Sequence, residues 1–377
     1  MGANKNGIMW EIALLFSALF LAYFNGANDN FKGVATLYGS GTTDYKRALL
    51  LATMSTFLGS VAALVVAQEL LAAFTGKGLV PNELIHAPAF ALAVGLGAAG
   101  TIFIATYLGF PVSTTHALIG ALSGIGFASG SLNFARLGST FLLPLLLSPL
   151  LAMAAAMTLS PLLQKIKQRL GSSGEICLCL KRGVVPMVYD RQKVAVLSSE
   201  AHIEIGDAAR CEREYADPLL TINTELLTDI IHYISSILVG FARGLNDTPK
   251  IAAILLMAGT VPVAPGMAIV GVAVFMALGG LLAARKVAEK MSKGVTSLDT
   301  NQGVSANLVT SILVLGASHI GVPVSTTHVS CGSLFGIGWV SGKGHWKTIA
   351  SIGAAWVITL PTAALLSVLV YWCVGSV

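Results

Sequence analysis

Apolar stretches follow one another along almost the whole chain, and most approach or exceed the length of about 20 residues that a helix needs to cross a bilayer. Five precede a polar interval and five follow it. They lie at about 8–39, 47–74, 84–108, 111–130, 136–160, 228–258, 264–284, 303–320, 322–341 and 347–374. The pattern predicts an all-α polytopic membrane protein with about 10–12 membrane segments, some of them broken helices or re-entrant segments.

The polar interval divides the chain into three parts. We expect a first membrane repeat at 1–160, a cytoplasmic loop at 161–227 and a second, inverted membrane repeat at 228–377. Inside the loop, residues 175–207 alternate between apolar and polar residues like short strands around turns, which predicts a small β-rich insert. The spacing of the nearby Cys and His residues matches no standard zinc pattern, so we expect no metal site. These residues are Cys177, Cys179, His202 and Cys211.

Composition supports a membrane protein. Hydrophobic residues make up 55% of the chain and charged residues 11%, whereas soluble domains carry roughly a quarter charged residues. The mean hydropathy is +0.78. The net charge of +5 follows the membrane topology, so it does not predict a nucleic-acid partner. We expect a lipid bilayer as the surroundings and no cofactor; a homodimer is one oligomeric state that the sequence leaves open.

Lys and Arg residues predict the orientation. If the 161–227 loop is cytoplasmic and each stretch crosses once, the shorter cytoplasmic connections carry eight Lys and Arg residues and the outer connections three. The eight are Lys46, Arg47, Arg285, Lys286, Lys290, Lys293, Lys343 and Lys347, and the three are Lys5, Lys77 and Arg136. This bias agrees with the positive-inside rule. We therefore expect a plasma (inner) membrane protein with both termini outside.

Two motifs occur once in each half. The letters PVSTTH stand at 111–116 and again at 323–328, and the pattern G-x-N-D-x-x-K occurs within 25–33 and again within 243–251. The offset is 212 residues for the first motif and 218 for the second, so order and spacing agree. The chain therefore contains a duplicated unit. Five crossings per half is an odd number, which predicts inverted repeats with a substrate site between them, as in secondary transporters.

The residues after the motif prolines favour an anion site. A proline suits the first turn of a helix, and a helix N-terminus offers free N–H groups and the positive end of the dipole to an anion. Hydroxyl side chains add donors at the same place without burying a charge. The predicted phosphate or oxyanion ligands are Ser113, Thr114, Thr115, Ser325, Thr326 and Thr327. The alternative is that these hydroxyls only bond to helix backbone.

Asp29 and Asp247 favour a cation site, because an acid in an apolar stretch by default marks an ion or proton pathway. Each follows an asparagine, Asn28 or Asn246. Carboxylate, amide and backbone oxygens suit Na⁺, and a lone carboxylate suits H⁺. A lysine stands three residues after each acid, at Lys32 and Lys250. Each lysine is within helical reach of a structural salt bridge with its acid, but it can also exchange the acid for a bound anion. We therefore predict that Lys32 and Lys250 also bind phosphate.

These two duplicated motifs resemble those of the inorganic phosphate transporter (PiT) family of cation-coupled symporters, and the resemblance covers all but the central loop. It implies import of inorganic phosphate driven by Na⁺ or H⁺, in some members as a metal–phosphate complex. It places the phosphate and cation sites on the serines, threonines, asparagines and aspartates named above. The chain departs from the family pattern G-A-N-D-V-A-N by having Lys32 in place of the last Asn, and it has Pro249 before the second lysine.

Three other functions are compatible with parts of the pattern. A permease for another oxyanion such as sulfate would use the same hydroxyls and helix ends. An intramembrane hydrolase would use Ser113, His116 and Asp29, but a catalytic site needs only one copy. A passive anion channel would not need two buried aspartates. The leading prediction is a symporter that works by alternating access and not an enzyme.

Overall fold

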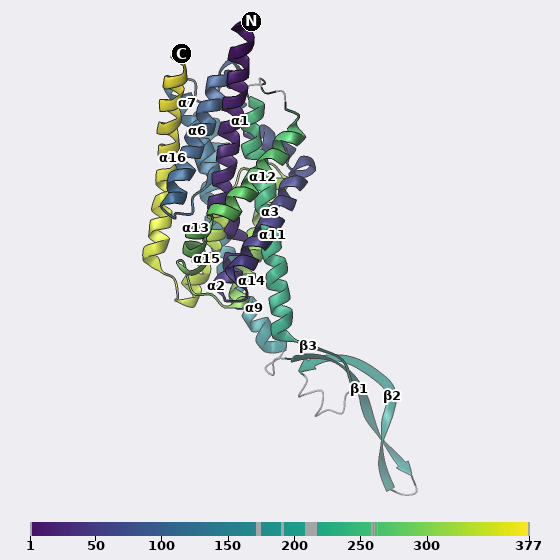
Figure 1. Ribbon diagram of the computed structural model, residues 1–377. Helices are drawn as coiled ribbons and strands as arrows, with labels where there is room; N and C mark the ends of the chain where they lie inside the picture. The colour runs from purple at the N-terminus through teal and green to yellow at the C-terminus, as the bar shows by residue number, and fades with distance from the viewer. Residues whose placement is uncertain are drawn as a thin grey trace.

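The computed structural model describes residues 2–170, 175–189, 192–207, 217–257, 259, 261 and 263–375; its side chains are described for 7–168 and from 223 onward within those ranges. It is a bundle of helices with a small sheet at one end (Figure 1). The helices before the sheet are α1 (Gly2–Asp29), η1 (Asn30–Gly33), α2 (Ala35–Gly39), α3 (Tyr45–Val66), α4 (Gln68–Ala73), α5 (Asn82–Ile85), α6 (Pro88–Tyr107), α7 (Thr114–Ala128), α8 (Phe134–Arg136), η2 (Leu137–Leu142) and α9 (Leu143–Leu170). Those after it are α11 (Thr224–Met257), α12 (Pro265–Ala283), α13 (Arg285–Lys293), α14 (Thr300–His319), α15 (Thr326–Ser341) and α16 (Trp346–Gly375).

The bundle is that of a multi-pass membrane protein. Seven helices of the described chain are long and apolar enough to cross a membrane, and they include α1, α3, α6, α9, α11, α12 and α16. This is fewer than the 10–12 segments expected, although each of the ten predicted stretches contains a helix. The PVSTTH helices α7 and α15 have only 15 and 16 residues. They lie in opposite halves of the bundle, α7 nearer the termini and α15 nearer the sheet (Figure 1).

Broken helices were expected among the membrane segments, and of the two helices that carry the G-x-N-D-x-x-K motif only the first shows a break. There, α1 ends at Asp29 and continues as the 3₁₀ turn η1. In the second copy α11 runs unbroken through Asn246 and Asp247, with Pro249 inside it. Proline lacks an N–H, so one carbonyl of the preceding turn loses its helical hydrogen bond without ending the helix.

The two halves of the sequence exchange helices. Helix α1 packs on α12, and α3 packs on α11. Helices α6 and α7 pack on α16, and α9 packs on both α14 and α15. One hydrophobic cluster accordingly joins α1, α6, α7 and α12 and includes Ala363 of α16. The other joins α14 and α15 with Ala52 of α3 and Ala152 of α9. Each apolar core therefore needs helices from both halves, and the expected boundaries at 160 and 228 divide the sequence but not the packed bundle.

Glycines allow the closest of these contacts. Gly120 of α7 faces the carbonyl oxygen of Leu360 in α16, and Gly332 of α15 faces that of Pro149 in α9. A Cβ atom at either position would overlap the facing oxygen. Small residues at such points let helix backbones approach one another, which is how membrane helices gain packing energy.

Gly332→Ala is therefore expected to lower the melting temperature of the detergent-solubilised protein, measured by tryptophan fluorescence. Gly353→Ala is the matched control. Gly353 also lies inside an α-helix, α16, but a Cβ atom there would have no neighbouring atom within 4 Å. Alanine is favoured over glycine in a helix interior by about 1 kcal/mol, so the control should be as stable as the wild type or more stable. Equal melting temperatures for the two variants would show that α15 and α9 do not need their close approach.

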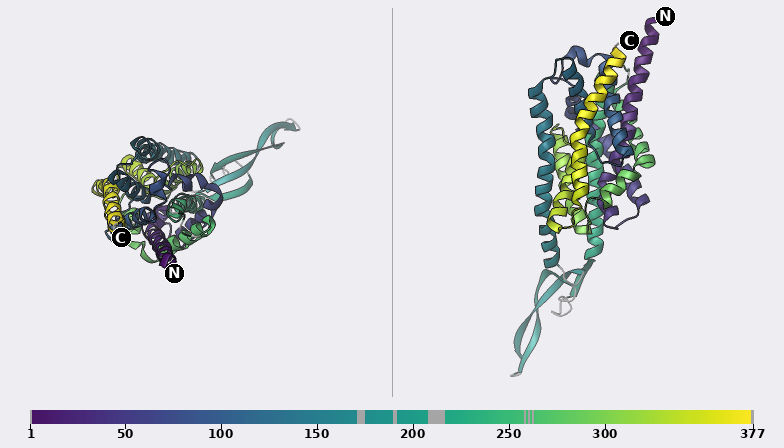
Figure 2. Two further views of the ribbon diagram at one scale, coloured as in Figure 1. Left: turned by 90° about the horizontal axis from the view of Figure 1, so that it is seen from above. Right: turned by 90° about the vertical axis from the view of Figure 1, so that its left-hand side faces the viewer.

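A three-stranded antiparallel sheet joins α9 to α11. Its strands are β1 (Glu175–Tyr189), β2 (Gln192–Asp207) and β3 (Asp217–Asn223), in the order β2-β1-β3. The sheet projects from the end of the bundle opposite to both chain termini (Figures 1 and 2). The side chains considered above for a metal site, those of Cys177, Cys179, His202 and Cys211, lie outside the described residues.

Candidate functional site

The N-termini of α7 and α15 meet in the interior of the bundle. Ser113 is the N-cap of α7 and its hydroxyl accepts a hydrogen bond from the backbone N–H of His116 at 3.0 Å. Ser325 caps α15 in the same way, accepting from His328 at 3.2 Å. Serine is a favoured cap because its oxygen satisfies one of the free N–H groups of the first turn. Each serine oxygen thus holds its helix start by accepting this bond, which leaves the O–H of the serine as a donor.

The two helix starts are also bonded to each other. The hydroxyl of Thr115 donates to the carbonyl oxygen of Val324 at 3.2 Å. The hydroxyl of Thr327 donates to the carbonyl oxygen of Val112 at 2.8 Å. In each bond the second threonine of one PVSTTH motif donates to the valine carbonyl of the other motif. The same contact is made twice with the halves interchanged.

Asn28 and Asn246 support the extended residues that lead into these helices. The amide of Asn28 donates to the carbonyl oxygen of Phe110 at 2.9 Å, and its oxygen accepts from the N–H of Val112 at 3.0 Å. The amide of Asn246 donates to the carbonyl oxygen of Val324 at 3.3 Å, and its oxygen accepts from Ser318 at 3.2 Å. Both amide oxygens, predicted to be cation ligands, already accept a hydrogen bond here.

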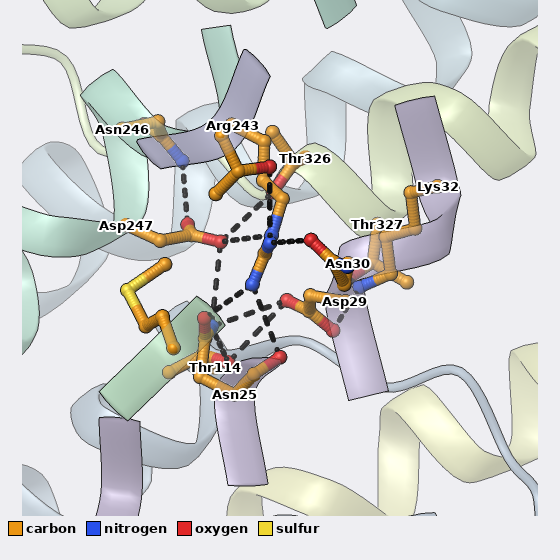
Figure 3. A network of polar contacts seen from close by, with 12 residues as sticks. Asn25, Asp29, Asn30, Lys32, Thr114, Arg243, Asn246, Asp247, Thr326 and Thr327 are labelled. Atoms are coloured by element: carbon orange, nitrogen blue, oxygen red, sulfur yellow. Dashed lines mark hydrogen bonds and ion pairs between the residues drawn. The ribbon is translucent and has the colours of Figure 1, made fainter. Parts of the chain in front are cut away.

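The two buried carboxylates lie beside the second motif threonines. The hydroxyl of Thr114 donates to Asp29 Oδ2 at 3.5 Å, and that of Thr326 donates to Asp247 Oδ2 at 3.4 Å. A single amide, that of Asn25, reaches both carboxylates, at 3.3 Å from Asp29 Oδ2 and 3.4 Å from Asp247 Oδ2 (Figure 3). The structure thus brings together two acids that are 218 residues apart in the sequence.

Arg243 is the central residue that the sequence analysis did not assign to the site. Its side chain is 0% exposed and donates to the side-chain oxygens of Asn25 at 2.6 Å and Asn30 at 3.2 Å. Its Nε lies 3.7 Å from Asp247 Oδ2 (Figure 3) and has no hydrogen-bond partner among the described residues. A signal was present, because Arg243 is a charged residue in an apolar stretch. It also occupies the repeat position that Asn25 holds in the first half.

Each lysine bridges the two halves. Lys32 Nζ contacts the carboxylate of Asp29 and the hydroxyl of Thr327, and it donates to the carbonyl oxygen of Val112 at 3.3 Å. Lys250 Nζ donates to the hydroxyl of Thr115 at 2.8 Å and to the carbonyl oxygen of Val324 at 2.7 Å, and it lies 3.8 Å from Asp247.

The site carries a surplus of positive charge. Among the described residues, the buried Asp, Glu, Lys and Arg side chains are Asp29, Lys32, Arg243, Asp247 and Lys250. Three of these are cations and two are anions, so the fully ionised site has a net charge of +1. A buried charge is costly unless it is paired. The fully ionised site therefore has one positive charge without an anionic side chain to balance it, and the helix N-termini of α7 and α15 add positive partial charge.

His116 and His328 do not face the motif hydroxyls. Their rings stack on each other at a centroid distance of 4.3 Å, and His328 also packs on Trp356 at 3.9 Å. The Ser113 hydroxyl accepts from backbone and not from an imidazole nitrogen. A serine nucleophile requires a base hydrogen-bonded to its oxygen, so this arrangement does not favour a hydrolase.

The sequence profile of the phosphate transporter family matches residues 25–367. The chain belongs to the phosphate transporter family. The predicted resemblance is thus confirmed, and the match spans both copies of the duplicated motifs and the central loop between them.

Individual members of the phosphate transporter family match over nearly the whole chain. The chloroplastic inorganic phosphate transporter 2-1 of Arabidopsis thaliana is 26% identical over 98% of this chain and 73% of its own length. A Pyrococcus abyssi protein whose name contains the words phosphate permease is 28% identical over 97% of this chain and 99% of its own. The solved structure of "the sodium-dependent phosphate transporter" has a TM-score of 0.75 and 20% identity, and the match covers 98% of this chain and 100% of that one. This structural likeness shows a shared fold.

Proposed function

We propose that this member of the phosphate transporter family imports inorganic phosphate by symport with Na⁺ or H⁺. The observation that carries the proposal is the surplus positive charge of the buried site, which lies between two helix N-termini. The proposed phosphate ligands are the motif hydroxyls with Lys32 and Lys250, joined by Arg243. The proposed cation site is centred on Asp29 and Asp247, with the neighbouring asparagines Asn28 and Asn246 holding the helix starts around it.

Phosphate is favoured over sulfate by the position of the carboxylates. Each lies within 3.5 Å of a motif threonine hydroxyl. An oxyanion that accepts a hydrogen bond from Thr114 or Thr326 would therefore touch Asp29 or Asp247. Near neutral pH phosphate carries a hydroxyl that donates to a carboxylate, whereas sulfate has no such donor and would place its oxygens against the carboxylate oxygens without a hydrogen bond between them.

Alternating access is supported by the matched contacts between the halves. The same threonine-to-carbonyl and lysine-to-threonine bonds occur twice with the halves interchanged. Such duplication is expected of inverted repeats that close around a site near the midplane. The threonine bonds join the two helix starts, and the lysine bonds join η1 and α11 to the helix start of the other half. Rocking the helices packed around α7 against those packed around α15 would break these bonds and open the site to one side.

The proposed orientation places the sheet in the cytoplasm and both termini outside. The distribution of Lys and Arg supports it, and the termini and the sheet do lie at opposite ends of the bundle (Figure 2). In a bacterial cell this corresponds to the plasma (inner) membrane.

The proposal predicts that purified protein in liposomes accumulates labelled phosphate when a Na⁺ or an H⁺ gradient is imposed, and only equilibrates it when there is none. Because the carboxylates disfavour an anion without a donor, a hundredfold excess of sulfate should leave the rate nearly unchanged. The measurement is the initial rate of uptake under the three conditions. Equilibration under all three would indicate a channel or facilitator, and full competition by sulfate would contradict the assignment of the substrate.

A further inference from the structure

We infer that the ammonium groups of Lys32 and Lys250 occupy the places of coupling cations, so that phosphate uptake by this chain does not require Na⁺. The inference rests on the proposed function and chooses between its two coupling ions. In this inference, the cation beside each site carboxylate is a lysine ammonium of the protein and not a dissolved ion.

The surroundings of each ammonium are those of a hard-cation site. Lys32 Nζ contacts three oxygens. Two belong to the carboxylate of Asp29 and the hydroxyl of Thr327 (Figure 3), and the third is the carbonyl of Val112. Carboxylate, hydroxyl and backbone carbonyl oxygens are the ligands that hard metal ions take in proteins. An ammonium group has three N–H donors, so each of the three oxygens can accept one of them while the site holds no phosphate.

The second lysine has the same three kinds of oxygen. Lys250 Nζ donates to the hydroxyl of Thr115 and the carbonyl of Val324, and it lies 3.8 Å from the carboxylate of Asp247. In both copies the hydroxyl comes from the opposite half and also donates to the carbonyl that binds the lysine. A structural salt bridge requires only the carboxylate. The repeated set of all three oxygens indicates a cation position.

A free Na⁺ competes poorly for such a place. The lysine is tethered three residues from its carboxylate and is therefore present at a high effective concentration. Lys32 is 3% exposed and Lys250 0%, so a displaced ammonium would remain buried without its partner, which costs several kcal/mol. The tethered ammonium thus supplies the positive charge that Na⁺ would otherwise bring.

The test compares wild-type protein with Lys32→Asn and Lys250→Asn in liposomes, with equal concentrations of NaCl or choline chloride on both sides. The wild-type ratio of initial phosphate uptake rates in Na⁺ and choline should be about 1. Each variant leaves a carboxylate, a hydroxyl and a carbonyl without a cation, so Na⁺ should now bind there and raise its rate at least about fivefold, the lower range of measured site–site coupling.

Melting temperatures provide a readout that does not depend on transport. NaCl should raise the melting temperature of Lys32→Asn by a few degrees relative to choline chloride, because a ligand stabilises the state that binds it. The wild type should show no such shift. The matched control is the double variant Asp29→Asn with Lys32→Asn, which lacks the carboxylate and should also show no shift.

Wild-type uptake that falls fivefold or more in choline would overturn the inference and leave phosphate transport established. A folded Lys32→Asn protein that responds to Na⁺ in neither assay would also overturn it. Absence of wild-type phosphate uptake in both media would instead contradict the proposed function. The melting series would still decide whether the lysine fills a cation site.

Discussion

Asp29→Asn and Asp247→Asn are each expected to reduce gradient-driven phosphate uptake at least about 100-fold while leaving the protein folded. The two carboxylates are 1% and 2% exposed and each is paired with a lysine of its own half. Asparagine has the same shape but no charge. The variant side chain can neither bind a cation by charge nor balance the ammonium beside it, and a loss of about 2.7 kcal/mol in binding free energy corresponds to a factor of about 100.

The measurement is the initial rate of labelled phosphate uptake into liposomes, with size-exclusion chromatography to confirm a monodisperse protein. Asp44→Asn is the matched control, because Asp44 caps α3 at an exposed position, where its carboxylate pairs with Arg47. Asparagine caps helices as well as aspartate does, so uptake by the control should equal that of the wild type. Wild-type rates in both site variants would remove the carboxylates from the transport site.

Arg243→Gln is expected to abolish phosphate uptake almost completely. The substitution changes the ionised site from a net charge of +1 to 0, which removes the attraction for an anion. It also leaves Asp29 and Asp247, both bonded to the amide of Asn25, without the guanidinium beside them. We expect uptake to fall at least about 100-fold, which corresponds to a loss of about 2.7 kcal/mol in the binding free energy of the anion.

Arg243→Lys tests whether the geometry of the guanidinium matters as well as its charge. The side chain donates to Asn25, Asn30 and Thr56 at once, which a single ammonium cannot reproduce. The lysine variant should therefore recover only part of the activity. Arg136→Gln is the exposed control and should transport normally. Full activity of Arg243→Gln would show that the surplus positive charge does not bind the substrate.

The residues of the candidate site could be predicted from the sequence because an unpaired polar group is costly inside a membrane. A charged or hydroxyl side chain in an apolar stretch must find a partner, so polar motifs such as PVSTTH identify buried contacts without any structure. Because each motif occurs twice, the sequence also indicated that each buried contact has a counterpart in the other half. Motif threonines, both aspartates and both lysines do meet in one network.

The partners of each residue could not be read from the sequence. Arg243 binds Asn25 across 218 positions and Lys32 binds Thr327 across 295. Asn28, expected to be a cation ligand, supports Phe110 and Val112 across more than 80 positions. Such pairings depend on which helices pack together, and packing is set by the shapes of whole helix faces.

The sequence by itself determined the membrane class, the two copies of the motifs and the polar residues that must be buried, because hydropathy and the cost of an unpaired polar group act residue by residue. Only the tertiary structure decided that the copies exchange helices, that Arg243 lies between the two aspartates, and that each lysine is surrounded by oxygens from both halves. These features arise when distant segments close around one another, and that closure is a property of the packed bundle.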